Sequence, residues 1–547
     1  MKKYLLLAAC ILATLVSCSP VQVQQDVPGG EGEDKPDNSV PSGPLHKALV
    51  ISASVDGKKI PSGGSTGGVS LSPEISLTFT REISVDEASL GAVTFSGGAF
   101  TAEIDPSVSS VLIVRPLQSL EPLKKYKFEI AAGECFGVNL QQAYSFSFTT
   151  AFDDSGDKFP QIPDEDLLTL VQERTFKYFW DYAHPVSGLA RERYGSGDTV
   201  TSGGSGFGIM AIPVGIERGF ITREEGAERM RKIIGFLEKA DRFHGAYSHW
   251  LNGSTGKVIP FSDKDNGGDL VETAFLMEGL LTASAYFDRD GEADIRAGID
   301  ALWRGVEWDW YTRGGEKVLY WHWSPDKDWA MNMHIRGWNE ALIVYVLAAS
   351  SPTHTISADV FRQGWGTFTF PVAKNQPLFF AHYSFLGLDP RNLSDSNGSY
   401  WAQNVAQARY NYDYCVRNTA GHAGYSENCW GLTASDYPGG YTASSPSSDK
   451  GTIAPTAALA SMPYMPDESM AALRYFYYKL GDRLFGTYGF KDAFCLDSGW
   501  FASSYLAIDQ GPIIAMIENH RTALLWKLFM KNQDVRGGLT KLGIAYE

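Results

Sequence analysis

Acidic side chains recur where loops enter strongly apolar segments of this 547-residue chain. Three segments show the pattern most clearly: residues 267–280 with Asp269 and Glu272, residues 336–345 with Glu340, and residues 505–518 with Asp509. Each segment is too apolar for a helix that faces water, so each predicts a buried helix with a carboxylate near its start. Helices that begin at one common face would bring these acids together. Paired carboxylates in an aromatic-lined cavity are the equipment of glycoside hydrolysis.

Aromatic residues gather in two of the loops between the expected helices, at Trp308–Tyr311 and Tyr320–Trp323. Sugar rings stack on indole faces, and sugar hydroxyls bond to polar side chains. A single tryptophan in such a loop more often fills core between helices. The cluster as a whole favours a sugar groove, and its expected contacts are Trp308, Trp321, His322 and Trp323.

Apolar residues recur at helical spacing from about residue 160 onward, beginning with Leu167–Trp180. Further helices are expected near 207–217, 223–240, 270–287, 292–304, 337–349, 400–415, 454–461, 467–480 and 512–531. No 34-residue repeat accompanies them. This pattern predicts an all-α catalytic domain over 160–547, a double-layered (α/α)6 toroid. Its long loops, 311–335 and 421–450, are unusual unless they serve function.

A preceding region, 46–152, contains no tryptophan and alternates apolar and polar residues in short segments. The alternation predicts a small all-β sandwich. Segments 73–80 and 120–130 resemble bacterial Ig-like modules, which implies an Ig-like domain. We expect it to act as a spacer, with direct sugar binding as the alternative.

The first 17 residues combine two lysines with a short apolar run and predict a signal peptide. They end at Leu15–Cys18, which resembles a bacterial lipobox and implies lipidation of Cys18. Residues 18–45 are rich in Pro, Gly and acids and predict a flexible tether. The expected location is therefore the bacterial envelope, periplasmic or outer-membrane, with membrane contact through the lipid anchor only.

A formal net charge of −16 argues against nucleic acid and polyanionic partners and favours a neutral oligo- or polysaccharide. The cysteines lack the spacing of a zinc site or a disulfide framework. A Cys415–Cys429 bridge is one option, and buried free thiols are the favoured one. We expect a monomer.

Several longer segments resemble the glycoamylase-like domain of secreted bacterial proteins, a resemblance that runs over about 160–540. The segments that carry it are 176–193, 203–210, 320–325, 424–436 and 506–514. That domain is similar to glycoside hydrolase family 144, whose characterised activity class is hydrolysis of β-1,2-glucans. The resemblance implies an (α/α)6 barrel and an inverting mechanism with no metal and no cofactor.

The resemblance places Asp265, Asp269 and Glu272 together at the substrate groove. From the residues alone, Asp269 and Glu272 also form a capping box, in which both side chains satisfy free backbone N–H groups at a helix start. The run 263–269 is not a calcium loop, because Gly267 and Ala274 stand at two ligand positions.

Glu340 and Asp509 are the expected catalytic pair. The helix dipole alone would favour a first-turn glutamate, but the apolar neighbours of Glu340 predict a partly dry setting that raises its pKa. By resemblance Glu340 is the general acid. Asp509, just before Pro512, is assigned the base, although a helix cap would explain it as well.

The remaining candidates are weaker. Glu427 is the main rival for either catalytic role, and Glu518 is expected to be a paired structural acid. Further sugar contacts are expected from Arg336, Trp430, Asp436 and His322.

Two other functions stay open. A glycan-binding lipoprotein without catalysis needs the aromatic residues but no facing acids. A polysaccharide lyase on the same toroid handles acidic sugars and prefers a basic groove, which fits an acidic chain poorly. Ultraviolet absorbance separates a lyase from a hydrolase, because elimination leaves a conjugated double bond in the product.

The lipobox yields a first prediction. Replacement Cys18→Ala removes the thiol that carries the lipid, so the protein is expected in the soluble fraction or as an unprocessed precursor. Membrane fractionation with mass determination measures both outcomes. Unchanged membrane retention of a processed protein would contradict the lipobox.

Overall fold

The computed structural model describes residues 45–547. The expected signal peptide, Cys18 and all but the last residue of the expected tether therefore lie outside the described residues. Within 45–547, no helix combines the length and the apolar character that crossing a membrane requires.

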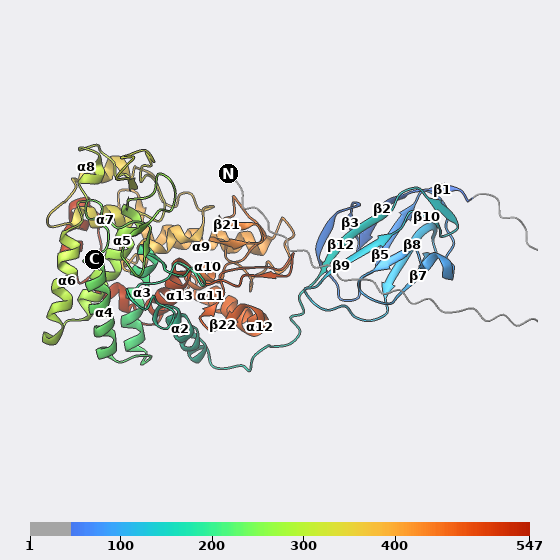
Figure 1. Cartoon of the computed structure of the whole chain (residues 1–547), viewed down its shortest axis with the longest axis horizontal. Helices are drawn as coiled ribbons and strands as arrows, with labels where there is room; N and C mark the ends of the chain where they lie inside the picture. Colours follow the sequence, from blue (N-terminus) through green and yellow to red (C-terminus); the bar gives the residue numbers. More distant parts are fainter. Residues whose placement is uncertain (1–44) are drawn as a thin grey trace, which may run out of the picture. The chain divides into compact units, whose positions relative to one another are not determined.

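The N-terminal part of the described chain is built from strands, drawn in blue to cyan in Figure 1. Sheets of five strands (β3-β2-β5-β8-β7), four strands (β4-β12-β9-β6) and three strands (β1-β11-β10) make up this Ig-like region. The strands are β1 (Lys47–Ala48), β2 (Val50–Val55), β3 (Lys58–Ile60), β4 (Ser65–Val69), β5 (Ile75–Phe79), β6 (Val93–Phe95), β7 (Phe100–Asp105), β8 (Val108–Pro116), β9 (Lys125–Ile130), β10 (Gly133–Cys135), β11 (Val138–Leu140) and β12 (Tyr144–Thr150).

Strict alternation explains why these segments form sheets. In β5, Ile75, Leu77 and Phe79 are buried while the residues between them are more exposed. In β9 and β12, Phe128 and Phe146 stack with ring centroids 5.3 Å apart across the paired strands. The strands expected from the sequence are confirmed here.

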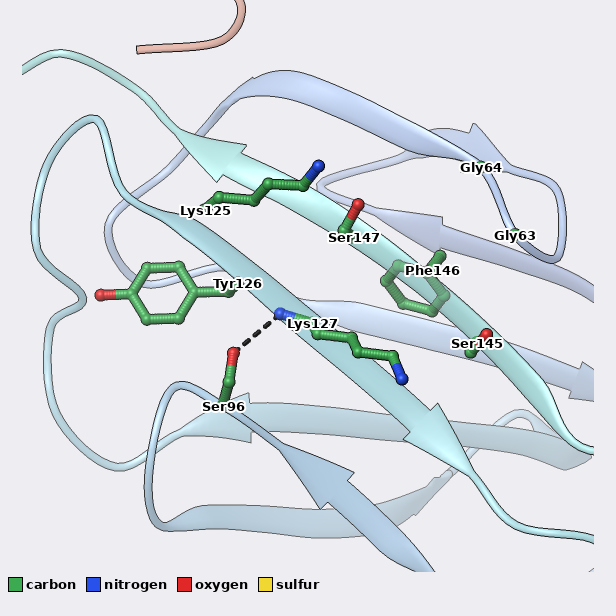
Figure 2. Close-up of a pocket in the computed structure, with 9 residues that line it drawn as sticks. All are labelled: Gly63, Gly64, Ser96, Lys125, Tyr126, Lys127, Ser145, Phe146 and Ser147. Atoms are coloured by element: carbon green, nitrogen blue, oxygen red, sulfur yellow. Dashed lines mark hydrogen bonds between the residues drawn. The ribbon is translucent and has the colours of Figure 1, made fainter. Parts of the chain in front are cut away.

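The four-stranded sheet carries a shallow depression of about 430 Å³, shown in Figure 2. Lys125 and Lys127 of β9 are exposed beside it, while Tyr126 and Phe146 are 4% and 2% exposed. Among the nine residues that line the depression, no aromatic ring is therefore exposed enough to stack on a sugar.

The C-terminal part is mostly helical (Figure 1). Its α-helices are α2 (Asp164–Trp180), α3 (Ser202–Glu217), α4 (Arg223–Leu237), α5 (Leu270–Tyr286), α6 (Ala293–Arg304), α7 (Leu342–Ser350), α8 (Ala358–Gly364), α9 (Tyr400–Arg417), α10 (Pro455–Leu459), α11 (Pro466–Arg474), α12 (Gly481–Leu484), α13 (Ala507–Thr522), α14 (Leu524–Phe529) and α15 (Gln533–Leu542). Short helices η3 (Leu378–Ala381) and η4 (Tyr383–Phe385) lie between α8 and α9.

Burial separates inner helices from outer ones. Helices α3, α5, α7 and α13 are buried over most of their length, whereas α4, α6 and α15 bury one face. The inner helices pack against one another in the pairs α13 with α3, α3 with α5, α5 with α7, and α10 with α13.

Glycines bring α3 and α5 into close contact. A Cβ at Gly206 would lie 2.1 Å from the backbone oxygen of Phe275, and one at Gly279 would lie 2.1 Å from the backbone oxygen of Gly206. No side chain fits at either position. The glycine-rich run 203–208 therefore serves helix packing.

Two expected helix boundaries are wrong. The helix expected over 337–349 begins only at Leu342, so Glu340 lies in the turn before α7. The helix expected over 512–531 begins at Ala507 and divides at Ala523, which has a φ of +57°. Pro512 therefore lies inside α13.

Glu518 is a paired structural acid, as expected. Its carboxylate is 1% exposed and accepts two hydrogen bonds from Arg218, at 2.7 and 2.8 Å. Cys135, Cys415, Cys429 and Cys495 are free and buried, which agrees with the favoured expectation.

The Glu518–Arg218 pair yields a stability prediction. Arg218→Met leaves a buried carboxylate without its counter-ion and is expected to lower the free energy of unfolding by about 3 kcal/mol. Arg231→Met is the matched control, because the Arg231–Asp294 pair is 43% and 57% exposed and such pairs contribute at most about 1 kcal/mol. Urea unfolding measures both. Equal losses in the two variants would contradict the prediction.

Candidate active site

A pocket of about 460 Å³ opens where several inner helices begin. Its lining comes from the starts of α3, α5 and α13, from the turn before α7, and from η3 and η4. The lining residues are Glu192, Arg193, Thr201, His249, Trp250, Phe261, Val271, Glu272, Phe275, Trp321, Glu340, Phe379, Tyr383, Ala434, Tyr441, Ala443, Leu506 and Ile508. Acids distant in sequence do meet at a common face.

Glu272 lies in the first turn of α5 and points toward α3. Its Oε2 accepts hydrogen bonds from the Gly203 N–H at 2.8 Å and the Thr201 hydroxyl at 3.2 Å. Burial, reinforced by the nearby charge of Asp269, raises the pKa of Glu272. The expected capping box is only half right: Asp269 caps α5, accepting from Val271 and Glu272 N–H groups, while Glu272 bonds to α3.

Two histidines neutralise the acids beside Glu272. His249 Nδ1 lies 3.2 Å from Asp269 Oδ2, and His322 Nε2 lies 3.3 Å from Asp265 Oδ2 and 3.5 Å from Asp269 Oδ2. Burial alone would lower the pKa of each histidine. Glu272 and Asp269 raise that of His249 to about 9, and Asp265 and Asp269 raise that of His322 to about 10. Both imidazoles are therefore charged at neutral pH.

The same charges bear on metal binding. His249, Asp265 and Asp269 each place one potential ligand atom within 4.8 Å of the others. In Asp269, burial opposes ionisation, but the bonds from His249 and His322 hold its pKa below the usual range. Imidazolium groups repel a cation. The expectation that no metal takes part stays a prediction.

Glu340 reaches the pocket from the turn before α7. Burial is the main reason that its pKa rises to about 7, and the negative charges of Glu272 and Asp269 contribute. A carboxyl group with such a pKa is half protonated at neutral pH and can donate a proton, as the general acid of a glycosidase must.

Asp509 is the third residue of α13 and is 1% exposed. It does not line the pocket, although its neighbour Ile508 does. Burial, and then the neighbouring carboxyl of Asp492, raise the pKa of Asp509 well above its usual range. Its assignment as the base stays a prediction, and any transfer to it must pass through a hydroxyl group or water.

Two of the expected sugar contacts are core residues. Trp308 is 0% exposed and packs on Trp303 with ring centroids 5.9 Å apart. Trp430 is also 0% exposed, and its Nε1 donates to the backbone oxygen of Glu468 at 3.2 Å. Neither indole offers a face to a ligand, so these two assignments are wrong.

The other expected contacts divide into three groups. Trp321 lines the pocket, and His322 lies behind it in the charge network. Asp436, on strand β20 (Ala434–Tyr437), accepts from Arg193 at 3.1 Å, next to the pocket. Three expected contacts do not line the pocket: Glu427, Arg336 and Trp323. Glu427 and Arg336 are exposed.

Sequence reasoning missed several lining residues. Arg193 and Tyr383 have no spacing that marks them. The cluster of His249, Trp250 and Phe261 has ring centroids 4.4 to 5.8 Å apart. Trp250 begins strand β14 (Trp250–Asn252), and Phe261 reaches it only in the fold. The adjacent His249-Trp250 pair was the only local signal for it.

Carboxyl groups of differing pKa around an aromatic-lined pocket define a glycoside-hydrolase type of site. Family comparison agrees. Residues 332–533 match the family model described as "Putative glucoamylase", and residues 57–150 match the bacterial Ig-like domain model Big_5.

Relatives extend the comparison. An exo β-1,2-glucooligosaccharide sophorohydrolase (non-reducing end) of Parabacteroides distasonis is 48% identical over 419 residues, 70% of this chain and 58% of the relative. The structure of an endo-β-1,2-glucanase from Chitinophaga pinensis, with sophorotriose and glucose, is 49% identical with a TM-score of 0.68 over 70% of this chain and 99% of that one. A β-1,2-glucanase structure from Parabacteroides distasonis is 40% identical with a TM-score of 0.68 over 90% and 74%.

This degree of identity over nearly the whole Chitinophaga chain establishes the family. The protein belongs to the glycoamylase-like proteins of glycoside hydrolase family 144 and carries an N-terminal Ig-like domain. The chain spans somewhat more than half the length of the curated sophorohydrolase.

Proposed function

We propose that this protein hydrolyses a neutral β-glucan, in the first place β-1,2-glucan, with inversion at the anomeric carbon. The main support for hydrolysis is that Glu340 lines the pocket and that burial raises its pKa to about 7. Relatives named as β-1,2-glucan hydrolases of both exo and endo type support the linkage.

We also infer that the inner helices form the ring of an (α/α)6 toroid. The packing of α10, α13, α3, α5 and α7 in succession supports five members of that ring. The sixth place falls to η3 and η4: Tyr464, just beyond α10, donates its hydroxyl to the backbone oxygen of Ala381 at 2.9 Å, and η4 packs on α7.

In the proposed reaction, Glu340 protonates the leaving glycosidic oxygen while water attacks the anomeric carbon from the opposite face. Asp509 finally receives the proton that the water loses, through a sugar hydroxyl or a second water. An inverting pair normally stands about 6.5–9.5 Å apart to admit the water, and a relay allows a wider separation.

The pocket chemistry favours a neutral substrate. Trp250, Phe261 and Trp321 offer ring faces to sugar C–H groups, and acids outnumber cations around them. A uronic-acid polymer, the usual substrate of a lyase, would meet repulsion here. A purely binding role leaves the raised pKa of Glu340 without use.

The remaining assignments are proposals of the same kind. We propose a monomer that acts without a cofactor and is anchored in the bacterial envelope through lipidated Cys18, on the periplasmic side or in the outer membrane. The lipobox resemblance and the Pro-rich tether sequence support the anchor.

Product profiling tests the substrate. Incubation with linear β-1,2-glucan is expected to release reducing sugars without ultraviolet absorbance, because water rather than elimination breaks the linkage. Cyclic β-1,2-glucan has no chain end, so release from it separates endo from exo cleavage. Starch and β-1,3-glucan are the controls and are expected to stay intact. Release from starch alone would reject the proposed linkage, and an absorbing product would indicate a lyase.

Kinetics of Glu340→Gln and Asp509→Asn test the catalytic pair. Both changes keep side-chain shape but remove proton transfer, so each is expected to lower kcat by about 10²–10⁴-fold with little change in KM. Because Glu340 must be protonated, kcat/KM of the wild-type enzyme is expected to fall as pH rises above about 7.

Glu427→Gln is the comparison variant and is expected to lose less, since Glu427 is exposed outside the pocket lining. Near-normal turnover by Glu340→Gln would overturn its assignment. If Glu427→Gln alone were inactive, the acid role would move there.

A further inference from the structure

A second carboxyl group lies against Asp509 behind the pocket wall. Asp492 stands between strands β23 (Gly489–Phe490) and β24 (Phe494–Cys495) and is 2% exposed. Gln510, next to Asp509 on α13, donates its Nε2 to the backbone oxygen of Phe490 at 2.8 Å, which brings the segment of Asp492 against the start of α13. The charge of Asp492 in turn raises the pKa of Asp509. Neither the family resemblance nor the spacing of acids in the sequence singles out Asp492.

The hydrogen bonds around this pair are incomplete if both groups are ionised. The Asp436 N–H donates to Asp492 Oδ2 at 2.6 Å. Within residues 45–547, the other Asp492 oxygen and both Asp509 oxygens are buried and receive no hydrogen bond. Two carboxylates cannot donate to each other, and unpaired buried charges are very costly. One proton held between the two groups supplies a donor and removes one charge.

We propose that Asp492 is a positioning residue that shares one proton with Asp509, so that the two carboxyls act together as the base of the hydrolysis. The role of the pair as a base rests on the proposed function. The shared proton itself follows from burial and hydrogen bonding alone.

Groups facing the pair come from four elements. Two of them are Asp436 of β20 and Arg193 of the loop between α2 and α3, with Arg193 Nη1 3.1 Å from Asp436 Oδ1. Tyr383 of η4 and Tyr441 of β21 (Gly440–Ala443) are the other two. Burial, and then the charge of Asp509, raise the pKa of each tyrosine. Arg193 is the cation among these groups, and it also binds Glu192 at 2.9 Å.

That balance keeps a proton on the pair at neutral pH. Burial first, and then Asp436, raise the pKa of Asp492 to about 7 despite the Asp436 N–H bond and Arg193. The pKa of Asp509 is raised well above its usual range. One Arg193 charge is shared among several acids, which leaves too little positive charge to ionise both.

The proton inventory of one turnover is balanced. As the bond from the anomeric carbon to the glycosidic oxygen breaks, Glu340 gives its proton to that oxygen, and the water oxygen bonds to the carbon. The water's proton passes to the singly protonated pair, which then holds two protons. Loss of one proton to solvent and return of one to Glu340 restore the starting state.

Asp492→Asn in the full chain tests the proposal. The amide that this change introduces can donate to ionised Asp509, as protonated Asp492 does, but it cannot release its proton. Asp492→Ala is the second variant. It leaves ionised Asp509 without that donor, which raises the pKa of Asp509. The acidic limb of the kcat/KM profile reports uptake of the second proton by the pair. It is therefore expected to stay in place in Asp492→Asn and to move to higher pH by about one unit or more in Asp492→Ala. In Asp492→Ala, kcat at the optimum is expected to fall about tenfold or more with KM nearly unchanged. Asp467→Asn, an exposed site on α11, is the matched control. An unmoved acidic limb in Asp492→Ala together with a reduced kcat would mean that Asp492 is merely structural.

A stability measurement detects the proton without using activity. A carboxyl whose folded pKa exceeds its unfolded pKa binds more protons in the folded state, so the free energy of unfolding falls as pH rises from about 4 to 7. Urea unfolding at pH 5 and pH 7 is expected to show a smaller fall in Asp492→Asn than in Asp467→Asn. Asp509→Asn is the reciprocal variant and is expected to reduce the fall in the same way, including if Asp492→Asn folds poorly. An undiminished fall in the variants that fold would overturn the shared proton. Absence of turnover on any glucan would instead reject the proposed function and leave the stability result to decide the pair.

Discussion

Close packing of α3 against α5 is the contact on which the site depends. Gly206 and Gly279 allow the two backbones to approach until no Cβ fits between them. At that separation the N-terminus of α3 lies within reach of the first turn of α5, and Glu272 accepts the Gly203 N–H at 2.8 Å. The free N–H groups of two buried helix starts are satisfied by two acids: Glu272, which lines the pocket, and Asp269, which lies directly behind it. The packing explains why polar groups gather at the helix starts. The first N–H groups of a buried helix need hydrogen-bond partners, whereas the rest of such a helix needs only apolar contacts.

Neighbouring carboxyls in this site hold their protons very differently. Asp269 has its N-cap bonds and two histidines and stays ionised. Glu340 has burial and like charges around it and is half protonated near pH 7. Burial raises the pKa of both Asp509 and Asp492, and the carboxyl of Asp492 raises that of Asp509 further. The residue type is nearly the same in all four, so partners and burial determine which group can donate a proton and which can accept one.

Much of the architecture could be predicted from local pattern. The alternation of β5 and β12 and the continuous apolar runs of α3 and α5 are strong signals, because each depends on neighbours in sequence. The gathering of acids at helix starts followed from the same signals. Predictions failed where the deciding partner is distant: Trp308 is covered by Trp303 and other core residues, and Glu272 bonds to Gly203 rather than to its own helix. No local rule distinguishes an indole in a groove from one in the core.

Burial imposes a cost on this site that the rest of the domain must offset. The environment that raises the pKa of Glu340 and Asp509 also removes their hydration. Apolar side chains at these positions would cost the fold less free energy than buried carboxyls do. The compensation lies farther along the same inner helices. Within residues 45–547, no amide, hydroxyl or cationic group donates to the Asp509 carboxyl on α13, whereas Glu518, farther along the same helix, receives two bonds from Arg218 and further bonds from Gln172 and Thr522. One end of the helix is thus held by a satisfied ion pair while the other end keeps acids at a protonation state suited to catalysis. The hydrogen bonds and the ion pair of Glu518 thus help to offset the free-energy cost of the buried carboxyl at the start of the helix.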